Sequence, residues 1–534
     1  MTLRATGAVL ALLVAVAGSP KAQSPRGETV IQTTSGRVSG IATSHDVVAY
    51  RGIPYAAPPV GALRWRPPQP ALPWTGIRAA VEYGPPCFQA KWKGPSPDLT
   101  AMSEGCLALN VWVPPHKPGA RLPVMVHIHG GGFFAGAGAN AEPVDQVALA
   151  GQGVILVSMN YRLGIFGFLS HPDLSKESPA KASGNYGLMD QIAALRWIKA
   201  NIAAFGGDPG QVTIFGSSAG GSSVLYLMAS PLANGLFQRA IAQSAAKVFS
   251  PLKYRNGARF GYESAEAEGV RIAPDIGSLR ALPAGEVLAK AKSLMIPGDP
   301  ATLEFWPTVD GHLIPAHPAD LFELGQVANV PLIIGNTTDE GTLFANGHAA
   351  RTAGEWREFA RRAYPVGGDD LLAQYPAARD TDVFTSVSRY VTDWIFAGTT
   401  RGVARAMTRP GRRVWRYEFT RVNRAAWPFP DPPLGAFHSS ELGYVFGELT
   451  WRGPRPNPYD ATDRALAKAM SATWVRFART GDPNGGELPS WPQDVPNSDR
   501  RMAFGDTMTF SVDPNAAALD AYERVFTKMR QKER

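Results

Sequence analysis

Cysteine is scarce in this sequence, with two residues in 534. So few thiols exclude a disulfide-dense scaffold, and they say little about the core. Cys87 and Cys106 lie close together in the chain, and one bridge between them is expected in an oxidising compartment; two free buried thiols are the alternative. A bridge that closes a loop of this length would stabilise the fold by roughly 3 kcal/mol.

Long apolar runs are also missing after the first residues, so no stable membrane insertion is expected. Residues 1–22 carry Arg4, an apolar run over 8–17, and then small residues with Pro20. This order is typical of a signal peptide, and the run is about half of the roughly 20 residues that a membrane anchor needs. We predict a signal peptide over 1–22, one folded domain over 23–534, and a secreted or periplasmic protein.

Extended runs of one charge sign are missing too, although the net charge is +8 and the pI is about 9.4. Such a balance could indicate a polyanionic partner. The basic residues are scattered, however, and short pairs such as Arg361-Arg362 and Arg412-Arg413 lack interleaved aromatic residues. We therefore expect a solvated basic surface and no nucleic-acid partner.

The composition that remains is ordinary for a globular protein, with 45% hydrophobic and 18% charged residues. Short β-rich runs alternate with helical patterns, and no internal repeat is present. This alternation predicts an α/β fold with a central, mostly parallel sheet flanked by helices. The expected strands are apolar on both faces, as buried central strands are; they lie at 124–129, 154–158, 212–215, 240–243, 331–334 and 414–419.

Helical spacing of apolar residues predicts a crossover helix over 188–205, which Gly206-Gly207 would end. Two further regions, 252–307 and 354–408, are interpreted as helical insertions. Insertions in such folds cover the carboxyl edge of the sheet, where ligands bind. Another amphipathic helix is expected over 466–477, and the chain from residue 479 onward is expected to be rich in loops.

The segment 216–220, Gly-Ser-Ser-Ala-Gly, directly follows an expected strand and precedes a run compatible with a helix. This strand–turn–helix context is what a nucleophile elbow requires. The glycines leave room for the close approach of strand and helix. Ser218 would then present its hydroxyl from a strained turn.

A serine hydroxyl needs a histidine to accept its proton, and in α/β-hydrolases the chain order is serine, acid, histidine. Only His312, His317, His348 and His438 follow Ser218. His438 lies in a loop of small residues shortly after the strand expected at 414–419. It is therefore the preferred base, and the other three are interpreted as ordinary loop or helix histidines.

Two adjacent carboxylates could orient that histidine. Asp339 and Glu340 follow the strand expected at 331–334 by a short loop, and either could serve. Asp310 is a weaker candidate because its flanking residues indicate a turn, where aspartate commonly makes local hydrogen bonds.

Acyl transfer also needs hydrogen-bond donors for an oxyanion. The glycine run at 130–132 directly follows the first core strand, so Gly131 and Gly132 could present bare amides, with the amide of Ala219 as a third donor. The run lacks the pattern of a phosphate-binding loop. His127 and His129 share a strand face, but no third ligand cluster accompanies them, so neither a metal nor another cofactor is expected.

Taken together, these motifs resemble the type B carboxylesterase and cholinesterase-like family of α/β-hydrolases, from about residue 49 to 477. The motifs that carry the resemblance lie at 50–56, 103–112, 130–132, 160–164, 205–209, 216–220, 339–341 and 435–438. The resemblance implies an α/β-hydrolase fold with large helical insertions over the site.

The resemblance also implies a role for each site residue. Ser218 would be the nucleophile, Glu340 rather than Asp339 the triad acid, and His438 the base. It further implies Gly131, Gly132 and Ala219 as oxyanion donors and a bridge between Cys87 and Cys106. The expected activity is hydrolysis of small-molecule carboxylic esters through an acyl-enzyme.

The sequence departs from the family pattern at two informative positions. Ser217 stands where the family usually has glutamate, so we expect a less anionic cavity, weak binding of cationic choline esters, and acceptance of neutral or anionic esters. Only one of the family's several bridges is available, the Cys87 loop is short, and Trp92 is not at the spacing expected of a choline-stacking tryptophan, so a cholinesterase is not expected. Gly105 replaces the usual aspartate before the second cysteine, which leaves a local salt bridge in doubt.

Two alternatives remain open from the sequence. The same machinery could hydrolyse carbamates, amides or a bulky natural product with several esters, because a triad does not distinguish them. A non-catalytic binding protein of the same fold is the other alternative. Such proteins typically lack the nucleophile or the histidine, and both are present here.

Overall fold

A mixed sheet of 11 strands runs through the centre of the molecule within the residues that the structure describes. The structure is a computed structural model, and it describes residues 29–89, 101–139, 146–292, 305–364, 366–422, 434–449 and 459–533. The signal peptide predicted over 1–22 lies outside these residues.

The strands in the middle of this sheet pair in parallel, as their apolar sequences predicted. Each of the six predicted strands is present, and neighbouring strands β8, β7, β9, β10, β11 and β12 pair in parallel. Burial on both faces explains why these segments are apolar throughout. Their bounds are β7 Leu122–Ile128, β8 Ile155–Met159, β9 Gly207–Ser217, β10 Arg239–Gln243, β11 Leu332–Thr337 and β12 Val414–Phe419.

Antiparallel strands extend the sheet at both edges. One edge continues from β8 through β6 and β4 to β3, and the other continues from β13, which pairs in parallel with β12, to β14. A separate small sheet contains β1, β2 and β5. The bounds are β1 Val30–Gln32, β2 Arg37–Ser39, β3 Ile41–Ala42, β4 Val48–Pro54, β5 Ile77–Ala79, β6 Ala108–Val113, β13 Arg500–Phe504 and β14 Met508–Val512.

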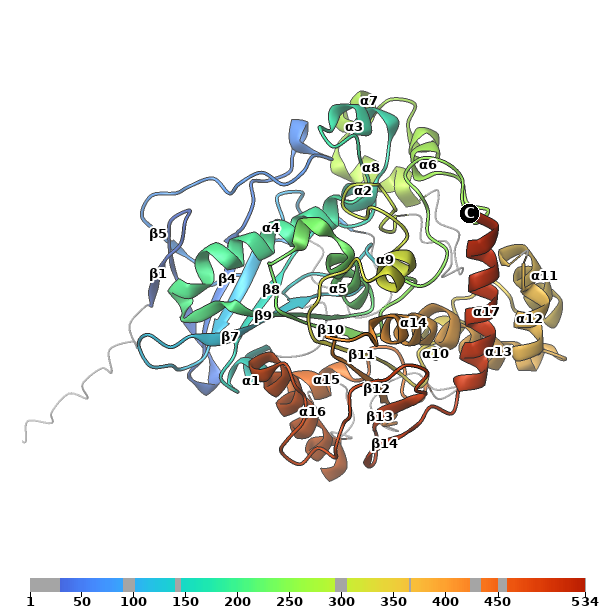
Figure 1. Ribbon diagram of the computed structural model, residues 1–534. Coiled ribbons are helices and arrows are strands. Elements are labelled where there is room, and N and C mark those ends of the chain that lie inside the picture. The colour runs from blue at the N-terminus through green and yellow to red at the C-terminus, as the bar shows by residue number, and fades with distance from the viewer. Residues whose placement is uncertain are drawn as a thin grey trace, which may run out of the picture.

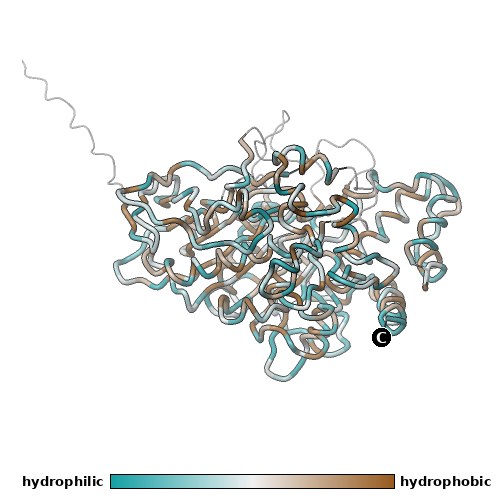
Figure 2. The backbone as a smooth tube through the Cα atoms, turned by 90° about the horizontal axis from the view of Figure 1, so that it is seen from above, coloured by the Kyte–Doolittle hydropathy of each residue, from teal (hydrophilic) through white to brown (hydrophobic). Residues whose placement is uncertain are grey.

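Helices cover both faces of the sheet, and side chains alternate along each strand to meet them (Figure 1). Along β7, Val124 and Val126 belong to the core shared with α4 and α5, whereas Met125 belongs to the core shared with α15 and α16. Apolar segments accordingly run through the middle of the molecule (Figure 2). The bounds are α1 Gln146–Ala150, α4 Tyr186–Asn201, α5 Ala219–Ala229, α15 Leu442–Phe446 and α16 Ala461–Thr480.

The predicted crossover helix is confirmed as α4, which continues as a 3-10 turn over Ile202–Phe205. Gly206 ends it in the left-handed region at φ 83°, where glycine has no side-chain penalty. The chain then enters β9, so β7, β8, α4 and β9 supply the frame that carries the predicted nucleophile.

The two predicted insertions are helical. The first contains α6 Ala265–Ile272, α7 Ile276–Ala281 and α8 Ala284–Lys292, and the second contains α11 Ala353–Ala363, α12 Gly368–Gln374, α13 Val383–Tyr390, a π-helical segment over Val391–Ala397 and α14 Gly398–Met407. Shorter helices are α2 Gly164–Phe168, α3 Pro172–Glu177, α9 Pro318–Leu324 and α10 Thr342–Ala345. The π-helical segment matters for the site because it packs against His438, as described below.

The prediction that the chain is rich in loops from residue 479 onward is wrong. This region contributes β13, β14 and the long helix α17 Ala516–Glu533, which packs on α12 and α14 at the right of Figure 1. Leu519, Tyr522, Phe526 and Met529 form the buried face of α17. Their helical spacing was visible in the sequence, but the many prolines, glycines and charges before it masked the signal.

Candidate active site

Ser218 occupies the turn between β9 and α5, the strand–turn–helix context expected from the sequence. Its backbone is strained, at φ 60° and ψ −126°. A Cβ at Gly216 or Gly220 would overlap the carbonyl oxygen of Ile128 in β7. Only glycine at both positions lets strand, turn and helix approach so closely.

His438 follows β12 in a loop that approaches this turn. Its Nδ1 is hydrogen-bonded to Oε2 of Glu340, and the imidazole is buried. The rings of Phe344 and Phe396 flank it, with centroids 5.1 and 4.7 Å from the imidazole. A histidine held at Nδ1 by a carboxylate has Nε2 available as a base.

The two candidate acids have different partners. Glu340 is fully buried, and its Oε1 accepts a hydrogen bond of 2.7 Å from the amide of Thr337 while Oε2 meets His438. Asp339 instead accepts from the amide of Ala436 at 2.8 Å, and its own amide donates to the Ala436 carbonyl at 2.9 Å. Burial raises the pKa of Asp339. Asp339 thus anchors the histidine loop, and Glu340 meets the imidazole.

The serine turn and the histidine loop touch through the neighbours of the two predicted residues. The hydroxyl oxygens of Ser217 and Ser439 lie 3.2 Å apart. Ser439 has φ 67°, which is uncommon for a residue other than glycine. This contact joins the residues next to Ser218 and His438, although 220 residues separate the two in the chain.

The glycine run forms the third wall of the site. A Cβ at Gly130 would lie 3.1 Å from the Cβ of Ser218, so the run passes beside the predicted nucleophile. Gly131 and Gly132 have φ 98° and 61°. Within the described part of the chain, the amides of Gly131, Gly132 and Ala219 donate no hydrogen bond. Because they lie on the two segments that flank Ser218, these N–H groups are available to stabilise an oxyanion.

The histidine pair at the end of β7 is structural. His127 and His129 are both buried, and burial lowers the pKa to about 3 and about 4 respectively. His129 stacks on Tyr161 and its Nδ1 lies 2.8 Å from the carbonyl oxygen of Gly130. Among the described residues, no group of three or more His, Cys, Asp or Glu side chains is placed to hold a metal ion.

The other candidates from the sequence lie outside the site. His317 caps α9 by accepting from the Ala319 amide, and His348 accepts from the Ala350 amide. Asp310 accepts from the amides of His312 and Ile314 in a turn. These local roles agree with the interpretation drawn from the sequence.

Sequence reasoning missed a second buried carboxylate behind the triad. Glu441 is fully buried, and its Oε1 accepts a hydrogen bond of 3.1 Å from Gln243. Its Oε2 has no hydrogen-bond partner among the described residues. Burial, with a further contribution from the charge of Glu340, raises the pKa of Glu441 to about 7. Its position three residues after His438 was the available signal.

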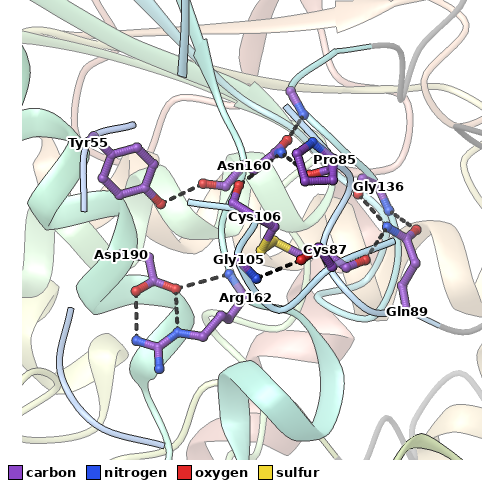
Figure 3. Close-up of a disulfide and its surroundings, with 12 residues drawn as sticks. Tyr55, Pro85, Cys87, Gln89, Gly105, Cys106, Gly136, Asn160, Arg162 and Asp190 are labelled. Carbon is purple, nitrogen blue, oxygen red and sulfur yellow. Dashed lines mark hydrogen bonds and ion pairs between the residues drawn. A yellow bond between two sulfur atoms is a disulfide. The ribbon is translucent and has the colours of Figure 1, made fainter. Parts of the chain in front are cut away.

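The bridge between Cys87 and Cys106 is present, with the two Cα atoms 5.0 Å apart. It supports the loop that continues from the glycine run at 130–132, because Gln89 exchanges hydrogen bonds of 2.8 and 2.9 Å with the backbone of Gly136 (Figure 3). Asn160 also joins Cys106 to this loop, donating to the Cys106 carbonyl and accepting from the Gly138 amide.

The residue before Gly105 forms a salt bridge of its own. Arg64 binds both carboxylate oxygens of Glu104, each at 2.6 Å. Both side chains are largely buried. This bidentate pair joins the segment before the second cysteine to the chain after β4.

Comparison with known proteins agrees with this geometry. A model described as the carboxylesterase family matches residues 27–522. The chain is 37% identical over 510 residues to a fumonisin B1 esterase of Sphingopyxis macrogoltabida, covering 93% of this chain and 89% of that protein. It is 35% identical over 505 residues to the para-nitrobenzyl esterase of Bacillus subtilis, covering 91% of this chain and 97% of that protein.

Similarity extends to three dimensions. A solved structure of PNB esterase matches with a TM-score of 0.77 at 33% identity, covering 93% of this chain and 100% of that one. Sequence and structure therefore agree over nearly the whole length. This chain belongs to the carboxylesterase family, and it is an ester hydrolase of the α/β-hydrolase fold.

Proposed function

We propose that the protein hydrolyses small-molecule carboxylic esters through an acyl-enzyme formed on Ser218, with His438 as the base and Glu340 as the acid that orients it. The observation that carries this proposal is the meeting of three chain segments. Glu340 binds Nδ1 of His438, and the Ser217–Ser439 contact joins the histidine loop to the serine turn.

In the first half of the reaction, His438 Nε2 takes the hydroxyl proton while Ser218 Oγ bonds to the ester carbonyl carbon. The oxyanion that forms accepts hydrogen bonds from the amides of Gly131, Gly132 and Ala219. The alcohol then leaves with the proton from His438, and the acyl group remains on Ser218. Water repeats the sequence and releases the acid.

We further propose that neutral or anionic esters are preferred to cationic ones. Ser217 carries no charge beside Ser218, and it is hydrogen-bonded to Ser439. Replacing it by glutamate would add a buried negative charge near the substrate. Kinetics on a choline ester and its uncharged isostere test this, and a wild-type preference for the choline ester would contradict it. The Ser217→Glu variant should shift the ratio toward choline.

We also propose that the protein is exported and that its mature form spans residues 23–534. The N-terminal pattern over 1–22 and the bridge between Cys87 and Cys106 support it, because disulfides persist in oxidising compartments. No helix among the described residues is long and apolar enough to cross a membrane. N-terminal sequencing of the protein recovered outside the cytoplasm would give the cleavage position, and retention of residue 1 would contradict export by this signal.

Covalent labelling tests the nucleophile directly. A fluorophosphonate should attach to the peptide that contains Ser218, and the Ser218→Ala variant should lose both labelling and ester hydrolysis. The Ser230→Ala variant, a change of another buried serine outside the site, should keep both. A label recovered on a different serine would reassign the nucleophile.

A further inference from the structure

Ser439 directly follows His438 and has an unusual backbone conformation. Its φ is 67°, whereas the φ of His438 is not positive. The amide of Ser440 donates a hydrogen bond of 3.0 Å to the carbonyl of Phe437, which closes a four-residue turn around the two. A positive φ at the third position alone is typical of a type II turn, where glycine or asparagine is favoured. Serine therefore occupies a position at which its side chain strains the backbone.

This turn determines where the imidazole lies, because His438 is its second residue. The chain is also held on either side of the turn. Before it, Asp339 exchanges hydrogen bonds with the backbone of Ala436. After it, Glu441 accepts a hydrogen bond of 3.1 Å from Gln243. Both anchors lie outside the turn, so neither of them fixes the peptide that directly follows the histidine.

A contact within the turn is made by the hydroxyl oxygen of Ser439, which lies 3.2 Å from that of Ser217. Ser217 is fully buried at the end of β9, where it pairs with Gln243 of β10. A Cβ at Gly130 would lie 2.9 Å from the Ser217 carbonyl oxygen, so the glycine run packs against the same backbone. Ser217 is therefore a fixed point directly before Ser218, and the hydrogen bond between the hydroxyls joins the turn to it.

Glycine would adopt this turn without strain, but it has no hydroxyl. The serine side chain thus adds one hydrogen bond to the turn while straining its backbone. Strain of this kind persists where the surrounding structure over-determines it, and it concentrates at functional sites. The hydrogen bond lies between the segments of the proposed nucleophile and base, where a misplacement of about 1 Å can lower a rate by roughly 100-fold.

We propose that Ser439 is a positioning residue, and that its hydrogen bond with Ser217 holds the imidazole of His438 in place relative to the hydroxyl of Ser218. This inference rests on the proposed function and adds to it two side chains that act through the proposed base. The reaction rate should then depend on the hydroxyl of Ser439, whereas stability should depend also on the backbone strain at the same residue.

Two variants of Ser439 separate these effects. Ser439→Gly removes the hydroxyl and relieves the strain, so its midpoint in urea denaturation should equal or exceed that of wild type. Ser439→Ala removes the hydroxyl and keeps the strain, so its midpoint should fall. Both should lower kcat for ethyl butyrate roughly 3- to 10-fold with KM little changed, the loss that corresponds to one neutral hydrogen bond. A merely structural role would instead make activity follow stability.

Ser217→Ala tests the partner of this hydrogen bond. It should lower kcat as much as Ser439→Gly does, and the double variant should lie within about 2-fold of either single variant, because both changes remove the same contact. Fluorophosphonate labelling counts the active sites of each protein, so that kcat refers to competent enzyme. Asn497→Gly, which places glycine at an exposed position with φ 61° in the loop before β13, should leave kcat unchanged.

A kcat equal to that of wild type in Ser439→Gly and Ser217→Ala would overturn the positioning role while leaving ester hydrolysis intact. Losses that multiply in the double variant would overturn it as well, because the two hydroxyls would then act independently. If one single variant does not fold, the kcat of the other still decides the matter. Absence of turnover of every ester by wild type would instead overturn the proposed function.

Discussion

Replacing Glu441 with glutamine should stabilise the protein at alkaline pH and have progressively less effect as the pH falls. Glutamine keeps an oxygen for the hydrogen bond from Gln243 and resembles the protonated acid, but it cannot ionise. The wild-type carboxyl is fully buried beside Glu340, so its charged form is disfavoured in the folded protein.

The magnitude follows from the difference in pKa between the two states. Burial raises the pKa of Glu441 from 4.5 to about 7. Below pH 4.5 the group is protonated in both the folded and the unfolded protein. Between 4.5 and 7 the folded protein holds more protons, so its stability decreases as the pH rises. Above 7 the full penalty of about 3 kcal/mol applies, and the glutamine variant escapes it.

Urea denaturation followed by tryptophan fluorescence at pH 5, 6, 7 and 8 measures this difference. The free energy of unfolding of Glu441→Gln minus that of wild type should increase with pH and level off near pH 8. Glu286→Gln controls for the loss of one acidic group at an exposed position. A difference that stays constant over this range, or that favours wild type as the pH rises, would refute the reasoning.

Three further predictions address the site and its support. Gly131→Ala should lower kcat by at least about 100-fold, because the new Cβ would overlap the carbonyl oxygen of Ala135 and displace the proposed oxyanion donors. Steady-state kinetics, with the active sites of both proteins counted by fluorophosphonate labelling, measures the change. An unchanged kcat would exclude this loop from the chemistry. Glu340→Gln should lower kcat by up to roughly 10,000-fold with KM little changed, and a loss below about 10-fold would contradict its assignment as the triad acid. Replacing Cys87 and Cys106 together by alanine should reduce the free energy of unfolding by about 3 kcal/mol in chemical denaturation, whereas an equal denaturation midpoint in wild type and variant would show that the bridge adds no stability.

Much of the central fold was readable from the sequence because it depends on local patterns. The apolar strands of the sheet, the helix α4 and its end at Gly206 all follow from residues that are neighbours in the chain. The context of Ser218 is equally local, since the strand, the glycines and the helix occupy adjacent positions. The family could be recognised for the same reason, because its motifs are short and ordered.

Features that arise from contacts between distant segments could not be read in this way. Asp339 and Glu340 are adjacent and chemically alike, and only the pairing of Asp339 with Ala436 turns Glu340 toward His438. The edge strands β13 and β14 were likewise missed, because their pairing with β12 and with each other stabilises them more than their own composition does.

Tertiary structure also determined which charged side chain is buried behind the site. A glutamate at 441 looks like a surface residue in the sequence, and the fold buries it beside Glu340. Local sequence determines which conformations a segment prefers, whereas burial and pKa depend on what the rest of the chain places around a side chain. The sequence alone therefore determined the chemistry that the chain can carry, and the packing of distant segments decided which groups meet and which charges they face.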